Sequence, residues 1–128
     1  MSRCRTVEPE IERLALSDGD FIDIKKRLNH GEQEDLFARM SPLQTPGEKI
    51  RLDSREVRTA KVLVYLVGWS LIDKALKPIP MSPDLPESVR LSAIRSVDPE
   101  SFTEMHDAIR AHEVKVAIRK NDQVGAQK

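Results

Sequence analysis

The chain has 128 residues, enough for one domain with a modest hydrophobic core, and we expect no second domain. Charged residues make up 33% of it, but the 21 basic and 21 acidic side chains cancel. Because DNA and RNA binding depends on concentrated positive charge, this balance argues against a nucleic-acid partner and favours a protein partner. The single cysteine, Cys4, excludes an internal disulfide and fits a reducing compartment. The charged N-terminus lacks an apolar signal segment, so the protein is expected to stay in the cytoplasm.

The first structured segment is predicted to be a β-hairpin over residues 12–28, after a frayed N-terminus at residues 1–11. Apolar residues alternate with polar ones on both sides of an Asp-Gly turn, and the alternating residues are Leu14, Leu16, Ile22 and Ile24. This alternation gives the hairpin one apolar face. A lone hairpin is marginal in water, so that face is expected to cover another element.

The register of this hairpin depends on the length of its loop. A two-residue loop would place Leu14 opposite Asp23, whereas a three-residue loop is expected to place Leu16 opposite Ile22 and Leu14 opposite Ile24. A slip of one residue would send the apolar residues of a strand to the wrong face. We therefore favour the second pairing.

A short helix is predicted over residues 31–40, with Asn29 as its cap and an apolar stripe of Leu36, Phe37 and Met40. Two prolines and a glycine follow in the run SPLQTPGE, residues 41–48. This composition predicts an irregular connection to the next helix.

The rest of the chain is expected to pack around a central helix over residues 54–73. Its centre, Val62 to Ile72, carries no charge, and Asp53 with Glu56 resembles a capping box before the apolar run. Eleven apolar or small residues span about 16 Å, far short of the roughly 20 residues that cross a bilayer. We therefore interpret the segment as a core helix and expect no membrane insertion.

A link with four prolines follows, from Leu76 to Glu87, and is read either as a polyproline recognition element or as a fixed crossover, the interpretation that we favour. Two more helices are predicted over residues 86–97 and 99–118. Asp98 and Pro99 form the start signal of the second, and residues 119–128 are expected to fray. The predicted fold is mainly α with a small N-terminal β-hairpin (α+β), its central helix packed by two or three further helices.

Residue patterns that would indicate catalysis or a cofactor are not recognisable. The three histidines, His30, His106 and His112, match no common metal-binding spacing, and the five glycines are too scattered for a phosphate-binding loop. The acidic cluster around Asp18 lacks the glutamate of a calcium loop, because Lys25 occupies that position. We expect no enzyme activity, no cofactor and no metal.

Two aromatic residues, Tyr65 and Trp69, lie four apart on the predicted central helix and are candidate anchors for a partner. The alternative is that other elements of the same chain cover them. Ile79 and Met81 of the proline link are further candidates for partner binding, since they alternate with prolines in an extended segment.

The chain contains, in this order, the segments SDGDFIDIKKRLNHGEQ, VRTAKVLVYLVGWSLID, KPIPMS and SVDPESFTEMHDAIRAHE. Their order resembles the tail assembly chaperones of long-tailed bacteriophages. In that family a DGDWI-like hairpin is followed by a helix ending in a W-S/T-L-x-D-like segment, a proline-bearing link and a helix begun by DPE. The resemblance covers Asp18 to Glu113, with Phe21 in place of the usual tryptophan.

This resemblance implies a small, non-catalytic factor of the host cytoplasm that binds the tape measure protein and helps tail tube subunits polymerise around it. It also implies a longer form made by ribosomal frameshifting and absence from the mature virion. Exposed apolar surface would favour a homo-oligomer. The alternatives are a structural tail or neck component and, less favoured by the charge balance, a small DNA-binding regulator.

Overall fold

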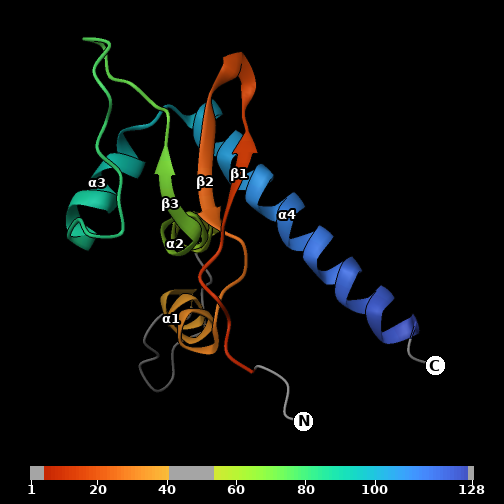
Figure 1. Cartoon of the computed structure of the whole chain (residues 1–128). Helices are drawn as coiled ribbons and strands as arrows, with labels where there is room; N and C mark the ends of the chain where they lie inside the picture. Colours follow the sequence, from red (N-terminus) through yellow and green to blue (C-terminus); the bar gives the residue numbers. More distant parts are fainter. Residues whose placement is uncertain (1–4, 41–53, 127–128) are drawn as a thin grey trace.

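The computed structural model describes residues 5–40 and 54–126, with side chains for residues 5–40 and 57–118. Figure 1 shows that this part of the chain combines a three-stranded antiparallel sheet with four helices. The elements are β1 (Ile11–Ala15), β2 (Phe21–Lys25), α1 (His30–Met40), α2 (Ser54–Tyr65), β3 (Leu66–Trp69), α3 (Glu87–Ser96) and α4 (Pro99–Ala126). The predicted α+β class is therefore confirmed.

The core lies between the sheet, which has the strand order β1-β2-β3, and the helices. The central strand β2 contributes Ile22 and Ile24, both fully buried, because alternate residues of a strand face the same side. Helix α4 crosses behind the sheet and extends beyond it, while α1 packs against α2 (Figure 1). The other fully buried side chains come from four elements and are Val62, Leu66, Ile94, Met105 and Ile109.

Strands β1 and β2 pair antiparallel as predicted, but in neither of the registers that the sequence suggested. Leu14 lies opposite Ile22, and the Leu16 N–H donates to the Asp20 carbonyl at 2.8 Å. The connection is a tight turn at Ser17–Gly19 in which Asp18 and Gly19 have φ angles of 58° and 80°, so that the chain reverses within three residues. The observed pairing differs from the favoured one by two residues. An even shift preserves the apolar face.

The predicted helix over residues 54–73 is wrong in its second half. Helix α2 ends at Tyr65, and β3 follows at once and pairs antiparallel with β2, placing Trp69 opposite Ile22. β2 would otherwise present a row of unpaired backbone groups, and β3, which contains Val67 and Trp69, two residue types that favour strands, pairs with them. The N-terminal strands therefore belong to a three-stranded sheet and are not an isolated hairpin.

The proline link covers the outer edge of β3. The Ile79 N–H donates to the Leu71 carbonyl at 3.0 Å, and an antiparallel bridge joins Ile72 to Pro78. Between these residues the chain forms a loop in which the Asp73 carboxylate accepts hydrogen bonds from the N–H groups of Ala75 and Lys77. The link is thus attached to the sheet at one end, in agreement with its interpretation as a fixed crossover.

Local start signals correctly located the helices on both sides of the sheet. Asn29 and Glu32 form a capping box at α1, with reciprocal side-chain to backbone hydrogen bonds of 2.8 and 2.9 Å. At α4, Asp98 accepts hydrogen bonds from the backbone and hydroxyl of Ser101, which lower the pKa of the Asp98 carboxyl group. Helix α3, predicted over residues 86–97, matches within one residue at each end.

The predictions for the C-terminal residues and for the connection before the central helix have different outcomes. Helix α4 continues to Ala126, so the prediction that residues 119–128 fray is wrong up to that point. The predicted connection at residues 41–48 and the Asp53 cap of the central helix lie outside the described residues. Within the described ranges, no helix is long and apolar enough to cross a membrane.

Two contacts fasten β1 and β2 to α4. The Ser17 hydroxyl donates to Glu104 Oε2 at 2.9 Å, and Glu104 also accepts from the Ser17 backbone N–H. Farther along α4, the His112 side chain is 5% exposed; its Nε2 donates to the Lys26 carbonyl at 2.7 Å, and its Nδ1 lies 3.1 Å from Glu12 Oε2. The buried His112 side chain therefore links α4 to the N-terminal strands.

Candidate interaction site at the proline link

Trp69 adds a side-chain contact to the backbone contacts that hold the proline link at the sheet. It ends β3, its ring is half-buried against the core, and its indole Nε1 donates to the Ile79 carbonyl at 2.9 Å. An indole has one N–H, and a half-buried indole needs an acceptor for it. The link supplies that acceptor, so Trp69 fixes the position of Ile79.

The structure brings three of the four predicted partner-binding residues together. Ile79 and Met81 are half-buried on the link, next to Trp69. A Cβ on Gly68 would lie 3.9 Å from the Met81 carbonyl oxygen, which shows how closely the link follows β3. Trp69, Ile79 and Met81 therefore form one continuous part of the surface.

Tyr65, the fourth predicted residue, lies elsewhere. Its side chain is 8% exposed, and its hydroxyl donates to Glu113 Oε2 at 3.0 Å, while Lys61 contacts the other oxygen of the same carboxylate at 2.8 Å. Burial, followed by the nearby Glu113 charge, raises the pKa of the Tyr65 hydroxyl. The expectation that Tyr65 and Trp69 share one helical face is wrong, because the chain leaves the helix between them.

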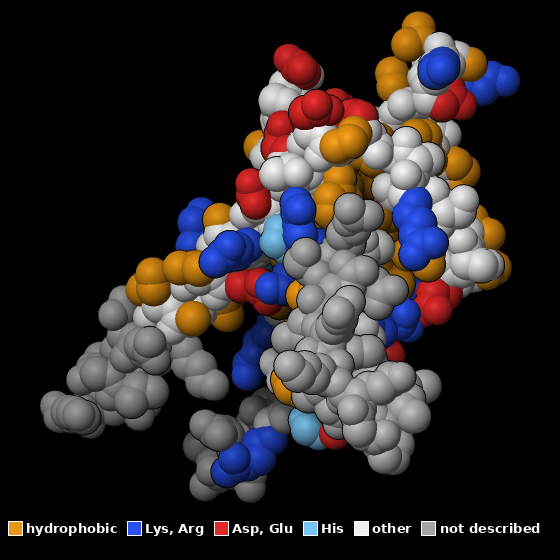
Figure 2. Space-filling view, turned by 180° about the vertical axis from the view of Figure 1, so that it is seen from behind, with side chains coloured by type: hydrophobic (Ala, Val, Ile, Leu, Met, Phe, Trp, Pro, Cys, Tyr) orange, Lys and Arg blue, Asp and Glu red, His pale blue; other side chains and the backbone are white. Residues whose placement is uncertain are grey.

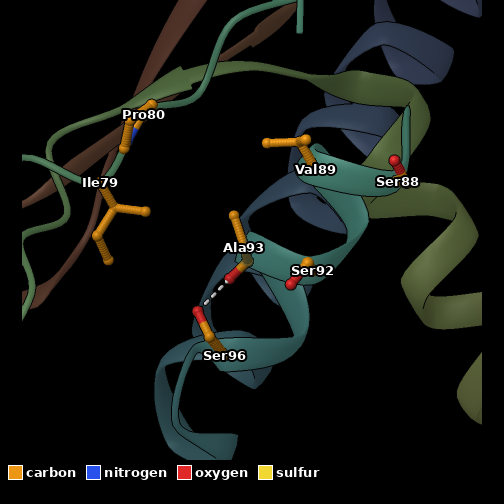
Figure 3. Close-up of a pocket in the computed structure, with 7 residues that line it drawn as sticks. All are labelled: Ile79, Pro80, Ser88, Val89, Ser92, Ala93 and Ser96. Atoms are coloured by element: carbon orange, nitrogen blue, oxygen red, sulfur yellow. Dashed lines mark hydrogen bonds between the residues drawn. The ribbon is translucent and has the colours of Figure 1, made fainter. Parts of the chain in front are cut away.

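A groove lies between the link and α3 and encloses about 410 Å³. Ile79 and Pro80 form one wall, and Figure 3 shows that Val89 and Ala93 point toward it from α3. Val89 is 46% exposed, so the groove is open to solvent along an apolar wall. Three serines of α3 complete the lining: Ser88, Ser92 and Ser96. We call this the link–α3 groove.

The loop from Asp73 to Lys77 projects beyond both the sheet and α3 (Figure 1). Its tip carries Leu76, which is 76% exposed and has a φ angle of 59°. A branched side chain at positive φ is a conformational outlier that costs about 1–3 kcal/mol, and such outliers cluster at functional sites. We call this segment the Leu76 loop.

Charges of opposite sign surround these two features. Lys74 and Lys77 are exposed on either side of Leu76, and Figure 2 shows the projecting tip as apolar side chains with basic ones beside them. Asp84 and Glu87 lie where the link enters α3. Glu87 forms an ion pair with Arg39, and hydrogen bonding to Glu87 is the main cause of the raised pKa of Arg39.

Sequence reasoning identified the link but missed the α3 wall of the groove and the Leu76 loop. Val89 and Ala93 share a helical face, which the sequence explains equally well as internal packing. A lone leucine between Lys74 and Lys77 was the available signal for the loop.

Side chains that could ligate a metal are scattered in the part of the chain whose side chains are described, residues 5–40 and 57–118. No three His, Cys, Asp or Glu side chains are grouped there in a way that could hold a metal ion. His106 stacks on Phe102 with ring centroids 6.5 Å apart, and burial is the main cause of its lowered pKa. His30 contacts Glu34 one turn along α1 at 2.8 Å, on the surface.

Comparison with known proteins gives no similar one: no protein-family model, no curated protein and no solved structure matches the chain significantly.

Proposed function

We propose that the protein is a tail assembly chaperone of a long-tailed bacteriophage, which binds the tape measure protein and assists polymerisation of the tail tube. The proposal rests on the order of the four sequence segments from Asp18 to Glu113 that resemble this family. It needs no catalytic group, no cofactor and no metal, and its partners are the tape measure and tail tube proteins.

The observation that carries the proposal is the contact between the second and third of these segments. Trp69 lies in GWSLID, the end of the second segment, and donates its indole N–H to the Ile79 carbonyl of KPIPMS, 10 residues farther along the chain. This contact holds an apolar, proline-rich strip beside α3 with its outer side exposed. A stiff strip of this kind loses little conformational entropy when it binds a partner.

The link–α3 groove suits the shielding of an apolar segment. Ile79, Val89 and Ala93 offer an apolar wall for one or two side chains of an extended or helical stretch. A tape measure protein is long, and its apolar stretches would otherwise associate with one another before the tube encloses them. The chaperone would cover these stretches and release them as tube subunits add.

Co-expression with the tape measure protein of the same phage tests this role. Val89→Arg should abolish co-purification, because it places a charge in the groove while Val89 is exposed enough for the fold to tolerate it. Phe37→Arg is the matched control: Phe37 is 69% exposed on α1 and does not line the groove, so this variant should co-purify like the wild type. Equal binding by both variants would contradict the groove as the binding surface.

Mass spectrometry of purified virions separates the chaperone from a structural tail or neck component. A chaperone acts in the host cytoplasm and should be absent from the particle, whereas a structural component should be present in fixed copy number. A slippery run in the gene before the stop codon would support the longer frameshifted form.

A further inference from the structure

We propose that the Leu76 loop of one copy of this protein inserts into the link–α3 groove of a second copy. The two surfaces are different patches of the same molecule, so each copy has one of each. The proposal concerns the protein alone and holds whatever partner the groove binds during tail assembly.

The Leu76 loop has the properties of an insertion element. Leu76 is the most exposed large apolar side chain of the described residues, and its positive φ angle turns it outward at the tip. The loop is also fixed in shape, because Asp73 accepts two backbone hydrogen bonds and the Ile72–Pro78 bridge closes its base. A pre-formed loop loses little freedom on binding, so even one buried leucine gives a useful contact.

The groove has the complementary shape and polarity. Its apolar wall of Ile79, Pro80, Val89 and Ala93 matches a branched aliphatic side chain, and its volume of about 410 Å³ leaves room for the Leu76 side chain. The serines of α3 are short, so they let the backbone of an incoming loop approach the helix closely.

Charge complementarity identifies the occupant as another copy. Lys74 and Lys77 flank Leu76, and Asp84 and Glu87 lie where the link enters α3, next in the chain to Ser88 of the groove lining. Among the described residues, the ammonium groups of Lys74 and Lys77 and the carboxylate of Asp84 have no ion-pair partner. Insertion of the loop would bring these unpaired groups of opposite sign together at the rim of the contact.

The loop cannot fill the groove of its own chain. The Ile72–Pro78 bridge lies between them, and Figure 1 shows the loop projecting away from α3. The contact joins one patch of each copy to a different patch of the next, so it either closes as a reciprocal pair, in which each loop enters the groove of the other copy, or continues into rings or open chains.

If the protein has the proposed chaperone function, this self-association would also regulate it, and only this regulatory effect rests on that function. A groove occupied by the loop of a second copy is closed to the tape measure protein, so the two partners compete. Leu76→Asn removes the loop's anchor but leaves the groove intact, and it should therefore strengthen binding to the tape measure protein, whereas Val89→Arg should abolish both contacts.

Analytical ultracentrifugation of the purified full chain tests the contact itself. The wild type should shift from the monomer of 14.5 kDa to larger species as its concentration rises toward about 1 mM, and added salt should reverse the shift. Leu76→Asn and Val89→Arg should each stay monomeric. Asparagine tolerates positive φ, so the first variant keeps the loop conformation, and unchanged circular dichroism checks the fold of both.

Mixing these two variants gives the decisive result. Leu76→Asn retains a groove and Val89→Arg retains a loop, so an equimolar mixture should form a complex of one copy of each and nothing larger. Phe37→Arg, the matched control, should associate like the wild type. A wild type that stays monomeric at every concentration, a mixture that stays monomeric, or a Phe37→Arg variant that loses association would each overturn the proposal.

Discussion

Two segments of this chain were each predicted to be a single helix from their apolar residues: the segment that forms α2 and β3, and the segment that forms α4. The observed helix lengths differ from the predicted ones in opposite directions. The first is shorter than predicted, since the helix stops at Tyr65 and the run continues as a strand. The second is longer, since α4 continues past residue 118 to Ala126. The comparison shows whether local residues or distant contacts determine the structure of each segment.

The segment after Tyr65 is decided by a distant neighbour. Leu66, Val67 and Trp69 suit either a buried helix or a strand, and the unpaired edge of β2 selects the strand. α4 begins at local signals, Asp98 and Pro99, and its backbone stays helical to Ala126. Tertiary contacts should therefore dominate the stability of the first segment, and only the first half of α4 should depend on them.

The largest expected effect separates the two halves of α4. Ile109 is fully buried under the sheet, whereas Ile118 is 53% exposed on the projecting half. Ile109→Ala should lower the free energy of unfolding by about 2–5 kcal/mol, because it leaves a cavity in the core. Ile118→Ala should change it by less than about 0.5 kcal/mol. Urea denaturation followed by circular dichroism measures both, and similar losses would mean that the projecting half is also packed.

A smaller effect should appear where β3 joins β2. The Ser70 hydroxyl accepts a hydrogen bond from the Phe21 N–H and donates one to Asp20, each at 2.9 Å. Ser70→Ala leaves that N–H without its acceptor and should cost about 1–2 kcal/mol by the same denaturation measurement. Ser96→Ala is the control, because Ser96 on α3 makes only an exposed hydrogen bond to Ala93, and it should be close to neutral. A neutral Ser70→Ala would indicate that the segment is not fixed to β2.

The smallest effect concerns the local start of α4 and depends on pH. Hydrogen bonds from Ser101 lower the pKa of Asp98 in the folded protein. A lowered folded-state pKa means that the charged carboxylate stabilises the fold above its unfolded pKa of about 3.9, and that this contribution is lost as the pH falls through the folded value. Asp98→Asn keeps a capping side chain but not the charge.

The wild type should therefore unfold at a slightly higher temperature than Asp98→Asn at pH 7, and the two melting temperatures should converge as the pH drops below about 4. A difference that is constant between pH 7 and pH 3 would show that the charge of Asp98 does not contribute.

The features that could be predicted from the sequence are those determined by residues close together in the chain. Asn29 with Glu32 and Asp98 with Pro99 are short-range signals, and both helices begin where these signals place them. The strand β3 and the β1–β2 register could not be predicted, because they depend on how separate segments of the chain are aligned in space. The candidate site was also predicted only in part. Ile79 and Met81 lie on the link, as the sequence indicated, but Tyr65 is buried in the core. The groove could not be predicted, because it forms only where α3 folds back beside the link.

The contacts between the N-terminal strands and α4 also set a condition on how the protein is made. The Lys26 carbonyl accepts its hydrogen bond from His112, which is synthesised 86 residues later. At about 5–20 residues per second, a ribosome needs about 4–17 s to add that length of chain. During this interval the apolar face of β2 has no α4 to cover it. Ile22 and Ile24 thus lack part of their cover while the ribosome is still translating the chain, and the core is completed only after α4 has been synthesised.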